Sequence, residues 1–134
     1  MKKTLSIIAL VLAVIISLVS CGEEATSASL WDSATYTENT TVGEGAITFK
    51  VKIEAEGKTV TLTVNTDEKI LGNALYELGL TNDPTFFNKI NGMTLDWDKT
   101  HAYWGFYIGD TMADHGVGDE PIKGGEVYRI AYTK

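Results

Sequence analysis

The sequence has few of the residues from which common functional centres are built. Its 134 residues include one cysteine and two histidines, with no cluster of the two types. A single cysteine cannot close an internal disulfide, and so few ligands do not make up a zinc site. The 18 Asp and Glu residues outnumber 11 Lys and Arg residues, which gives a net charge of −7. Because nucleic acid requires a basic face, this charge argues against a nucleic-acid partner.

Motifs of common catalytic centres are also missing. The chain contains no Gly-x-Ser-x-Gly nucleophile motif, and the glycines of residues 116–125 lead into no Gly-Lys-Ser/Thr phosphate-loop ending. The sole cysteine, Cys21, ends a segment with the pattern of an export signal, which accounts for it without catalysis. We therefore expect no enzyme activity, no catalytic residues, no metal site and no required cofactor.

The N-terminal segment has the pattern of a bacterial export signal. Lys2 and Lys3 precede an apolar run of 15 residues at 5–19, and the sequence Leu-Val-Ser-Cys ends at Cys21. The run is shorter than the ~20 residues of a membrane-spanning helix, which favours a signal peptide at residues 1–20. The tetrapeptide resembles a lipobox, in which the cysteine receives a diacylglycerol. We expect a lipoprotein attached through Cys21 to the extracytoplasmic face of the cell membrane.

The next segment is predicted to be a tether. Residues 21–44 begin with the lipidated cysteine and continue with Ser, Thr, Ala and Glu, without a basic residue or apolar periodicity. Such a composition is typical of a flexible, solvated chain. Trp31 leaves alternatives open, because it could dock on the folded domain, rest at the membrane interface, begin an extra edge strand or stay disordered.

A folded domain is predicted from residue 45 to residue 134, and it begins with a β-hairpin. Apolar residues alternate with polar ones over 47–55 and again over 59–64. If Glu56 and Gly57 form a two-residue turn, the apolar residues of the two strands face one another on one side of the hairpin. The pairs would be Ala55 with Lys58, Ile53 with Val60, Val51 with Leu62, and Phe49 with Val64.

The rest of the domain predicts one helix and further strands. Apolar residues at helical spacing follow Thr66, which is a candidate N-cap, and Gly79 should end the helix. Asn91-Gly92 predicts a turn, and strands are expected at 101–108 and 126–132. Two strands, one helix and then more strands is the order of a β-grasp. We therefore expect an α+β, β-grasp-like fold with a mixed sheet packed on one helix.

Three segments resemble a known family. The Asn91-Gly92 turn, residues 103–110 (YWGFYIGD) and residues 116–127 (GVGDEPIKGGEV) resemble the C-terminal domain of transcobalamin and intrinsic factor. They resemble still more the bacterial lipoprotein relatives grouped as domain of unknown function 4430. The resemblance covers residues 46–133, and it implies a β-grasp of the soluble-ligand-binding type and a cobalamin-like ligand. This sequence shows no counterpart of the large helical domain that completes the vitamin site in the vertebrate members, and a fold does not fix a function.

The strand at 101–108 carries the candidate ligand-binding face. Alternation places Trp104 with Ala102, Phe106 and Ile108 on one face and places Tyr103 and Tyr107 around Gly105 on the other. The first face is typical of a core, although Trp104 is also a candidate ligand contact. The second could stack a planar group, and Tyr128 and Tyr132 on the final strand could extend it if the two strands pair in the matching register. The alternative is ordinary cross-strand packing, since tyrosine favours strands.

The turn after this strand supplies the remaining candidate residues. Gly109, Asp110 and Met112 form the expected hairpin tip, and His115 follows on the same exposed rim. Met112 would be an adaptable contact. His115 could contact a ligand or simply be solvated. Asp110 and three later acids, Asp114, Asp119 and Glu120, could suggest calcium, but their spacing departs from a calcium loop and such acids are commonly turn formers.

Together these features predict a membrane-anchored extracytoplasmic lipoprotein with a small-molecule binding module. Its ligand would be cobalamin-like or another planar molecule, taken up and passed to a transporter or receptor. The alternative is a protein interaction or adhesion module on the cell surface. A concave aromatic cleft would favour the first hypothesis, and a flat apolar patch would favour the second.

Overall fold

The computed structural model describes residues 29–134. The expected signal peptide, Cys21 and the segment up to residue 28 lie outside the described residues. Within residues 29–134, no helix has the length and apolar character needed to cross a membrane.

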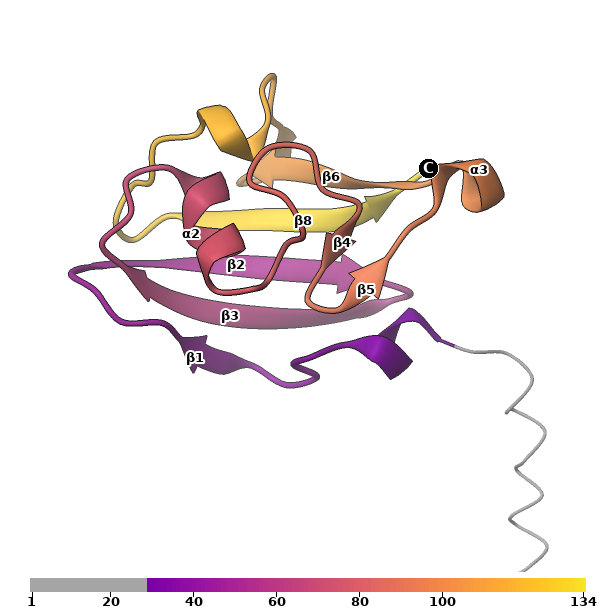
Figure 1. The fold of residues 1–134 in the computed structure, drawn as a ribbon, viewed down its shortest axis with the longest axis horizontal. Coiled ribbons are helices and arrows are strands. Elements are labelled where there is room, and N and C mark those ends of the chain that lie inside the picture. The colour runs from indigo at the N-terminus through magenta and orange to yellow at the C-terminus, as the bar shows by residue number, and fades with distance from the viewer. Residues whose placement is uncertain (1–28) are drawn as a thin grey trace, which may run out of the picture.

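A mixed six-stranded sheet runs through the described part of the chain (Figure 1). The strand order is β1-β3-β2-β8-β6-β7. β1 lies parallel to β3 and β2 lies parallel to β8, while the other neighbours are antiparallel. The strands are β1 (Thr40–Val42), β2 (Ile47–Ala55), β3 (Lys58–Thr66), β6 (Tyr103–Ile108), β7 (Thr111–Met112) and β8 (Val127–Thr133).

The hairpin of β2 and β3 has the predicted register. Ala55 pairs with Lys58, Val51 pairs with Leu62, and all the expected apolar pairs occur. Glu56 and Gly57 both have positive φ, at 52° and 77°, which is the conformation of the tight turn that suits the twist of two antiparallel strands. The alternating pattern and the turn therefore confirm the same hairpin.

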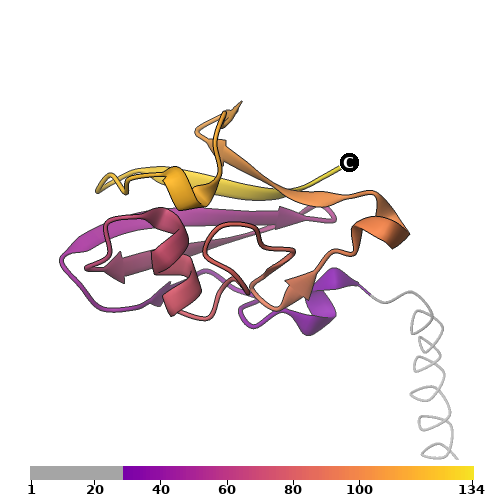
Figure 2. The same ribbon diagram turned by 45° about the horizontal axis from the view of Figure 1, so that its top comes forward.

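A second layer covers one face of the sheet (Figures 1 and 2). It includes the helix α2 (Leu71–Glu77) and a small hairpin of β4 (Lys89–Ile90) and β5 (Met93–Thr94). Three short helical turns complete the described elements, namely η2 (Leu30–Ser33), α3 (Trp97–Thr100) and η3 (Val117–Asp119). The core lies between the two layers and includes the fully buried side chains of Phe49, Ile53, Leu62, Leu71, Leu75, Ile90, Met93, Tyr128 and Ile130.

The helix begins later than predicted. Thr66 is the last residue of β3 and pairs with Ile47, so it is not the N-cap. Its hydroxyl accepts a hydrogen bond from the backbone N–H of Glu68 in the connecting turn. The N-cap position falls on Ile70, which makes no side-chain capping bond. The predicted end is confirmed, because Gly79 has a φ of +75° just beyond the helix.

The second correction concerns the predicted tether, because residues 29–44 pack on the domain. Trp31 is 9% exposed, and its Nε1 donates to the carbonyl oxygen of Ala55 at 2.9 Å. The Asn91 amide exchanges two hydrogen bonds with the backbone of Tyr36, at 2.9 and 2.8 Å. β1 then adds an edge strand to β3. Docking of Trp31 is thus confirmed, and the folded domain begins by residue 29 instead of residue 45.

Candidate functional site

The outer face of β6 has the predicted residues, but the protein itself covers its centre. Tyr103 is 44% exposed, as a platform residue should be. The Tyr107 ring, however, lies under the Arg129 guanidinium, whose central carbon is 4.0 Å from the ring centroid. The Tyr107 hydroxyl is 3.2 Å from the Thr133 hydroxyl oxygen, within hydrogen-bonding distance. A Cβ on Gly105 would lie 3.0 Å from Tyr107 Cε1, so the expected step over the glycine is filled.

The two later tyrosines do not extend this face. Tyr128 pairs with Ile108 and Tyr132 pairs with Trp104, and paired residues on antiparallel strands share a face. Tyr128 is fully buried in the core. Trp104 is 7% exposed, which confirms its expected core position. The register needed for an extended tyrosine platform is therefore not present, although Tyr132 borders a hollow of about 400 Å³ together with Tyr107 and Arg129.

The hairpin tip lies where it was expected. β6 and β7 are joined by Gly109 and Asp110, and Gly109 has a φ of +66°. Met112 is 44% exposed. Gly109 and Asp110 border a shallow hollow of about 370 Å³ that also includes Arg129. This hollow is on the outer face of the sheet, and its lining contains no aromatic ring.

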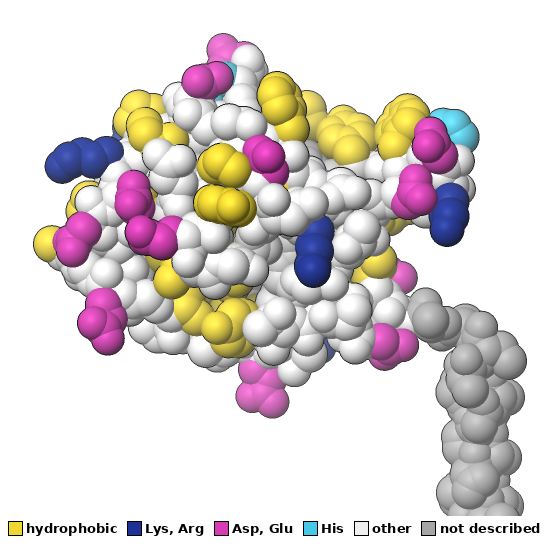
Figure 3. All heavy atoms as spheres, in the orientation of Figure 1, with side chains coloured by type: hydrophobic (Ala, Val, Ile, Leu, Met, Phe, Trp, Pro, Cys, Tyr) yellow, Lys and Arg dark blue, Asp and Glu magenta, His cyan; other side chains and the backbone are white. Residues whose placement is uncertain are grey.

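Tyr103 and Trp104 instead meet two further aromatic residues around a different hollow, which we call the aromatic hollow. Its volume is about 180 Å³, and its lining is Phe87, Asn88, Leu95, Asp96, Trp97, Ala102, Tyr103 and Trp104. Apolar side chains gather along β6 towards α3 on the surface of the molecule (Figure 3). The structure thus brings two of the seven predicted ligand-binding residues to one concavity, and it adds Phe87 and Trp97.

The geometry of α3 brings Trp97 to this position. Asp96 caps the helix, since its Oδ1 accepts from the Asp98 N–H at 3.0 Å. His101 ends the helix with a φ of 57° and reverses the chain into β6. The Trp97 and Tyr103 rings consequently lie 6.4 Å apart between centroids, with an interplanar angle of 51°.

One wall residue of the aromatic hollow has an unused donor. The Nε1 of Trp104 is buried and has no hydrogen-bond partner among the described residues. Most buried polar groups are paired, and a lone buried donor costs free energy. Trp97, by contrast, is 55% exposed. The hollow therefore combines exposed ring surface with a tryptophan whose donor is unsatisfied.

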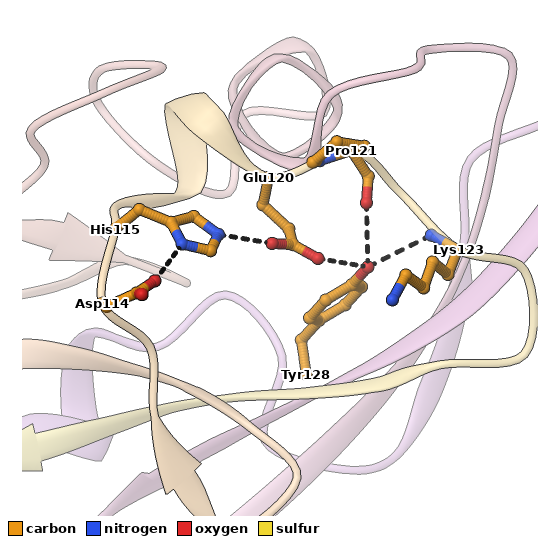
Figure 4. Close-up of polar contacts among 6 residues, drawn as sticks. All are labelled: Asp114, His115, Glu120, Pro121, Lys123 and Tyr128. Atoms are coloured by element: carbon orange, nitrogen blue, oxygen red, sulfur yellow. Dashed lines mark hydrogen bonds and ion pairs between the residues drawn. The ribbon is translucent and has the colours of Figure 1, made fainter.

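His115 belongs to a chain of polar contacts that sequence reasoning missed (Figure 4). Its Nδ1 is 2.6 Å from Asp114 Oδ1, and its Nε2 is 2.6 Å from Glu120 Oε1. Glu120 is only 5% exposed, and its Oε2 accepts from the Tyr128 hydroxyl at 3.3 Å. The backbone N–H of Lys123 donates to the same hydroxyl at 3.1 Å. Asp114 and His115 are adjacent in the sequence, and this adjacency is the one feature from which these contacts could have been suspected.

The contacts of His115 with the two carboxylates favour its charged form. The hydrogen bond to Glu120, and after it the bond to Asp114, raises the pKa of His115 above its usual range. The same bond to His115 lowers the pKa of Asp114. Burial raises the pKa of Tyr128 to about 12, so its hydroxyl stays protonated. Because both nitrogens of His115 are engaged, the residue ties the loop before β8 to the core and is not a free ligand contact.

The acidic residues of this region do not gather around a common point. Within residues 29–134, no group of three His, Cys, Asp or Glu side chains is placed to hold a metal ion. Asp114 is exposed and Glu120 is buried, on either side of His115.

Comparisons with known proteins indicate the fold alone. No protein-family model matches the chain, and no curated protein matches it. A crystal structure of a Ruminococcus gnavus protein, provisionally described as metal-binding, has a TM-score of 0.61 at 17% identity over 66% of this chain and 98% of that chain. Haptocorrin in complex with Cbi has a TM-score of 0.49 at 14% identity over 66% of this chain and 25% of that chain.

Proposed function

We propose that this chain is a lipid-anchored extracytoplasmic binding module whose aromatic hollow takes part of a small molecule during uptake. The lipobox-like sequence ending at Cys21 supports the anchor and the location in the cell envelope. The observation that carries the binding function is the presence of four aromatic residues, Phe87, Trp97, Tyr103 and Trp104, in the lining of one hollow. Aromatic side chains supply much of the contact energy in small-molecule sites.

The size of the aromatic hollow limits how a ligand fits. Its volume of about 180 Å³ is below the ~300–1,000 Å³ of clefts that enclose drug-sized ligands. A cobalamin-like or other planar ligand would therefore insert one substituent or one edge. The rest would lie over the exposed surfaces of Trp97 and Tyr103, which are 55% and 44% exposed.

The assignment of the fold to the β-grasp class is part of this proposal. The hairpin of β2 and β3, then α2, then further strands of the same sheet supports a β-grasp of the soluble-ligand-binding type. The proposed role needs no catalytic residue, no resident metal and no cofactor. A transporter or receptor in the same envelope would accept the ligand.

The second candidate function is protein interaction or adhesion at the cell surface. β7 pairs only with Tyr107 and Ile108, so the first half of β6 has no strand beside it on that side within residues 29–134. An open strand edge can add an extended peptide. Phe86, in the loop before β4, is 92% exposed. These two features favour docking on a protein partner.

A titration of the protein with cobalamin, cobinamide and heme tests the first function. Tryptophan emission would report binding, and calorimetry would exclude inner-filter artefacts. We expect saturable one-to-one binding of at least one ligand, weakened about tenfold by Tyr103→Ala or Trp97→Ala, since a loss of about 1.4 kcal/mol is tenfold in affinity. Tyr76→Ala is the matched control, because Tyr76 is 51% exposed on α2 and does not line the hollow.

Two results would contradict the binding proposal. One is the absence of saturable binding at the aromatic hollow by any small-molecule probe, these three ligands included. The other is binding that Tyr103→Ala and Tyr76→Ala weaken equally, which would place the ligand elsewhere. The interaction hypothesis would then gain support if a membrane partner captured by the protein were lost with Phe86→Ser and retained with Tyr76→Ser.

A further inference from the structure

We infer that the group entering the aromatic hollow is a cation of the alkylated-ammonium class. This inference rests on the proposed function and specifies the chemistry of its ligand. Aromatic rings carry negative charge on their faces and attract ammonium groups within about 6 Å, and quaternary ammonium ligands are held by several such rings together. Four aromatic residues line this one hollow, and the Trp97 and Tyr103 rings lie 6.4 Å apart between centroids.

The polar lining of the hollow has the matching charge. Asp96 contributes its carboxylate, and the other polar lining residue, Asn88, is neutral. Asp96 has no ion-pair partner among the described residues. Its Oδ1 accepts from the backbone N–H of Asp98, and the side chain is exposed. The side chains around the hollow therefore offer negative potential without a basic residue to cancel it.

Two potentially cationic side chains lie nearby without lining the hollow. Lys99 is exposed on α3. His101 contacts the Trp97 ring at 5.2 Å between centroids, with an interplanar angle of 67°. This contact occupies part of the Trp97 surface, while the indole is still 55% exposed and borders the hollow.

The volume of the hollow suits a compact cation. About 180 Å³ corresponds to roughly six water molecules at ~30 Å³ each, which admits a trimethylammonium group but no macrocycle. Planar anions such as heme would bring carboxylates towards Asp96 and towards a chain of net charge −7. Size and charge thus point to the same class of ligand group.

The test compares choline with 3,3-dimethyl-1-butanol, in which carbon replaces the charged nitrogen in the same shape. Both would be titrated into the protein by calorimetry and tryptophan emission, beside cobalamin, cobinamide and heme. We expect choline to bind at least tenfold more tightly than the neutral alcohol. Asp96→Asn should weaken choline several-fold and leave the alcohol unchanged, because asparagine keeps the helix cap and removes the charge.

Asp98→Asn is the control for a general change of charge, since Asp98 lies two residues away and does not line the hollow. It should leave the affinity for choline within about twofold, because Asp98 is exposed and outside the lining, and charges interact weakly through high-dielectric solvent. Equal binding of choline and the alcohol, or equal effects of the two substitutions, would overturn the cation inference and leave the proposed function standing.

The planar ligands separate the two remaining failures. If neither small probe binds while a planar ligand binds and Tyr103→Ala weakens it, the cation inference is overturned and the binding function stands. If none of the five compounds binds, both the inference and the proposed function fail. Trp97→Leu gives an independent check, because it should abolish choline binding while the folded state is retained at this exposed position.

Discussion

Replacing Trp31 with alanine tests whether the segment before β1 belongs to the folded domain. The side chain is 9% exposed, donates a hydrogen bond to Ala55 at 2.9 Å and lies 5.0 Å from the Lys58 ammonium. Truncating a core tryptophan costs about 3–5 kcal/mol. Because Trp31 lies at the border of the core, water can reach part of the vacated space, so we expect about 3 kcal/mol.

This loss is large for a single domain. Domains of this size are stable by about 5–15 kcal/mol, and each 1 kcal/mol lowers the melting temperature of a domain of about 100 residues by roughly 4–8 °C. Trp31→Ala should therefore lower the melting temperature by roughly 12–24 °C in a thermal scan. Trp31→Phe should cost less, because it keeps most of the apolar surface and loses mainly the hydrogen bond to Ala55.

Trp97→Ala is the matched control, because Trp97 is 55% exposed and should cost less than about 1 kcal/mol. Equal losses of melting temperature in Trp31→Ala and Trp97→Ala would refute the packing of residues 29–44 and would favour a flexible tether instead. Binding studies also depend on this result. A fragment that starts at residue 45 would lose Trp31 and β1, and it would leave the buried Asn91 amide without the Tyr36 backbone.

The histidine contacts, the Asn91-Gly92 turn and the outer face of β6 can each be tested by substitution. The folded-state pKa of His115 is raised above 6.5, so its bonds to Glu120 and Asp114 stabilise the protein fully below about pH 6.5 and less as the pH rises through the raised value. Urea unfolding across this pH range should show a decline in the free energy of unfolding. An undiminished decline in His115→Asn would contradict the role of His115. Gly92→Ala should destabilise the protein by roughly 1–3 kcal/mol, since Gly92 has a φ of +85° and a Cβ would lie 2.3 Å from the Ser33 carbonyl oxygen. Gly116→Ala, where a Cβ meets open space, should be nearly neutral in the same assay. Similar losses of unfolding free energy in the two variants would be inconsistent with this turn. Tyr107→Ala should leave ligand affinity within about twofold, while Tyr103→Ala weakens it about tenfold. A larger effect of Tyr107→Ala in the same titration would indicate that the ligand binds on the outer face of β6.

Local patterns were sufficient to predict the parts of the fold that depend on neighbouring residues. The β2–β3 hairpin follows from alternation and from a two-residue turn, and Asn91-Gly92 forms the expected turn with φ values of 54° and 85°. The start of α2 could not be predicted in the same way. Thr66 suits a helix cap, but pairing with Ile47 keeps it in β3.

The candidate site shows the same limit for contacts between distant segments. Alternation along β6 correctly placed Tyr103 on the exposed side and Trp104 in the core, and both residues border the aromatic hollow. It could not show that Arg129 covers Tyr107, because that contact depends on the register of β6 and β8. Trp97 lies on α3, which ends at the left-handed residue His101, and the sequence has no clear signal for this turn.

The indole resonances of the protein offer the most direct test of the aromatic hollow. The chain has three tryptophans, and all three lie in the described region. Trp97 and Trp104 line the hollow, while Trp31 Nε1 is bonded to Ala55 and serves as an internal reference. In ¹H–¹⁵N spectra recorded during titration with choline and with the planar ligands, we predict saturable shifts of the Trp97 and Trp104 indole signals and none of Trp31. Saturable binding that leaves the Trp97 and Trp104 signals in place would contradict a ligand site in the aromatic hollow.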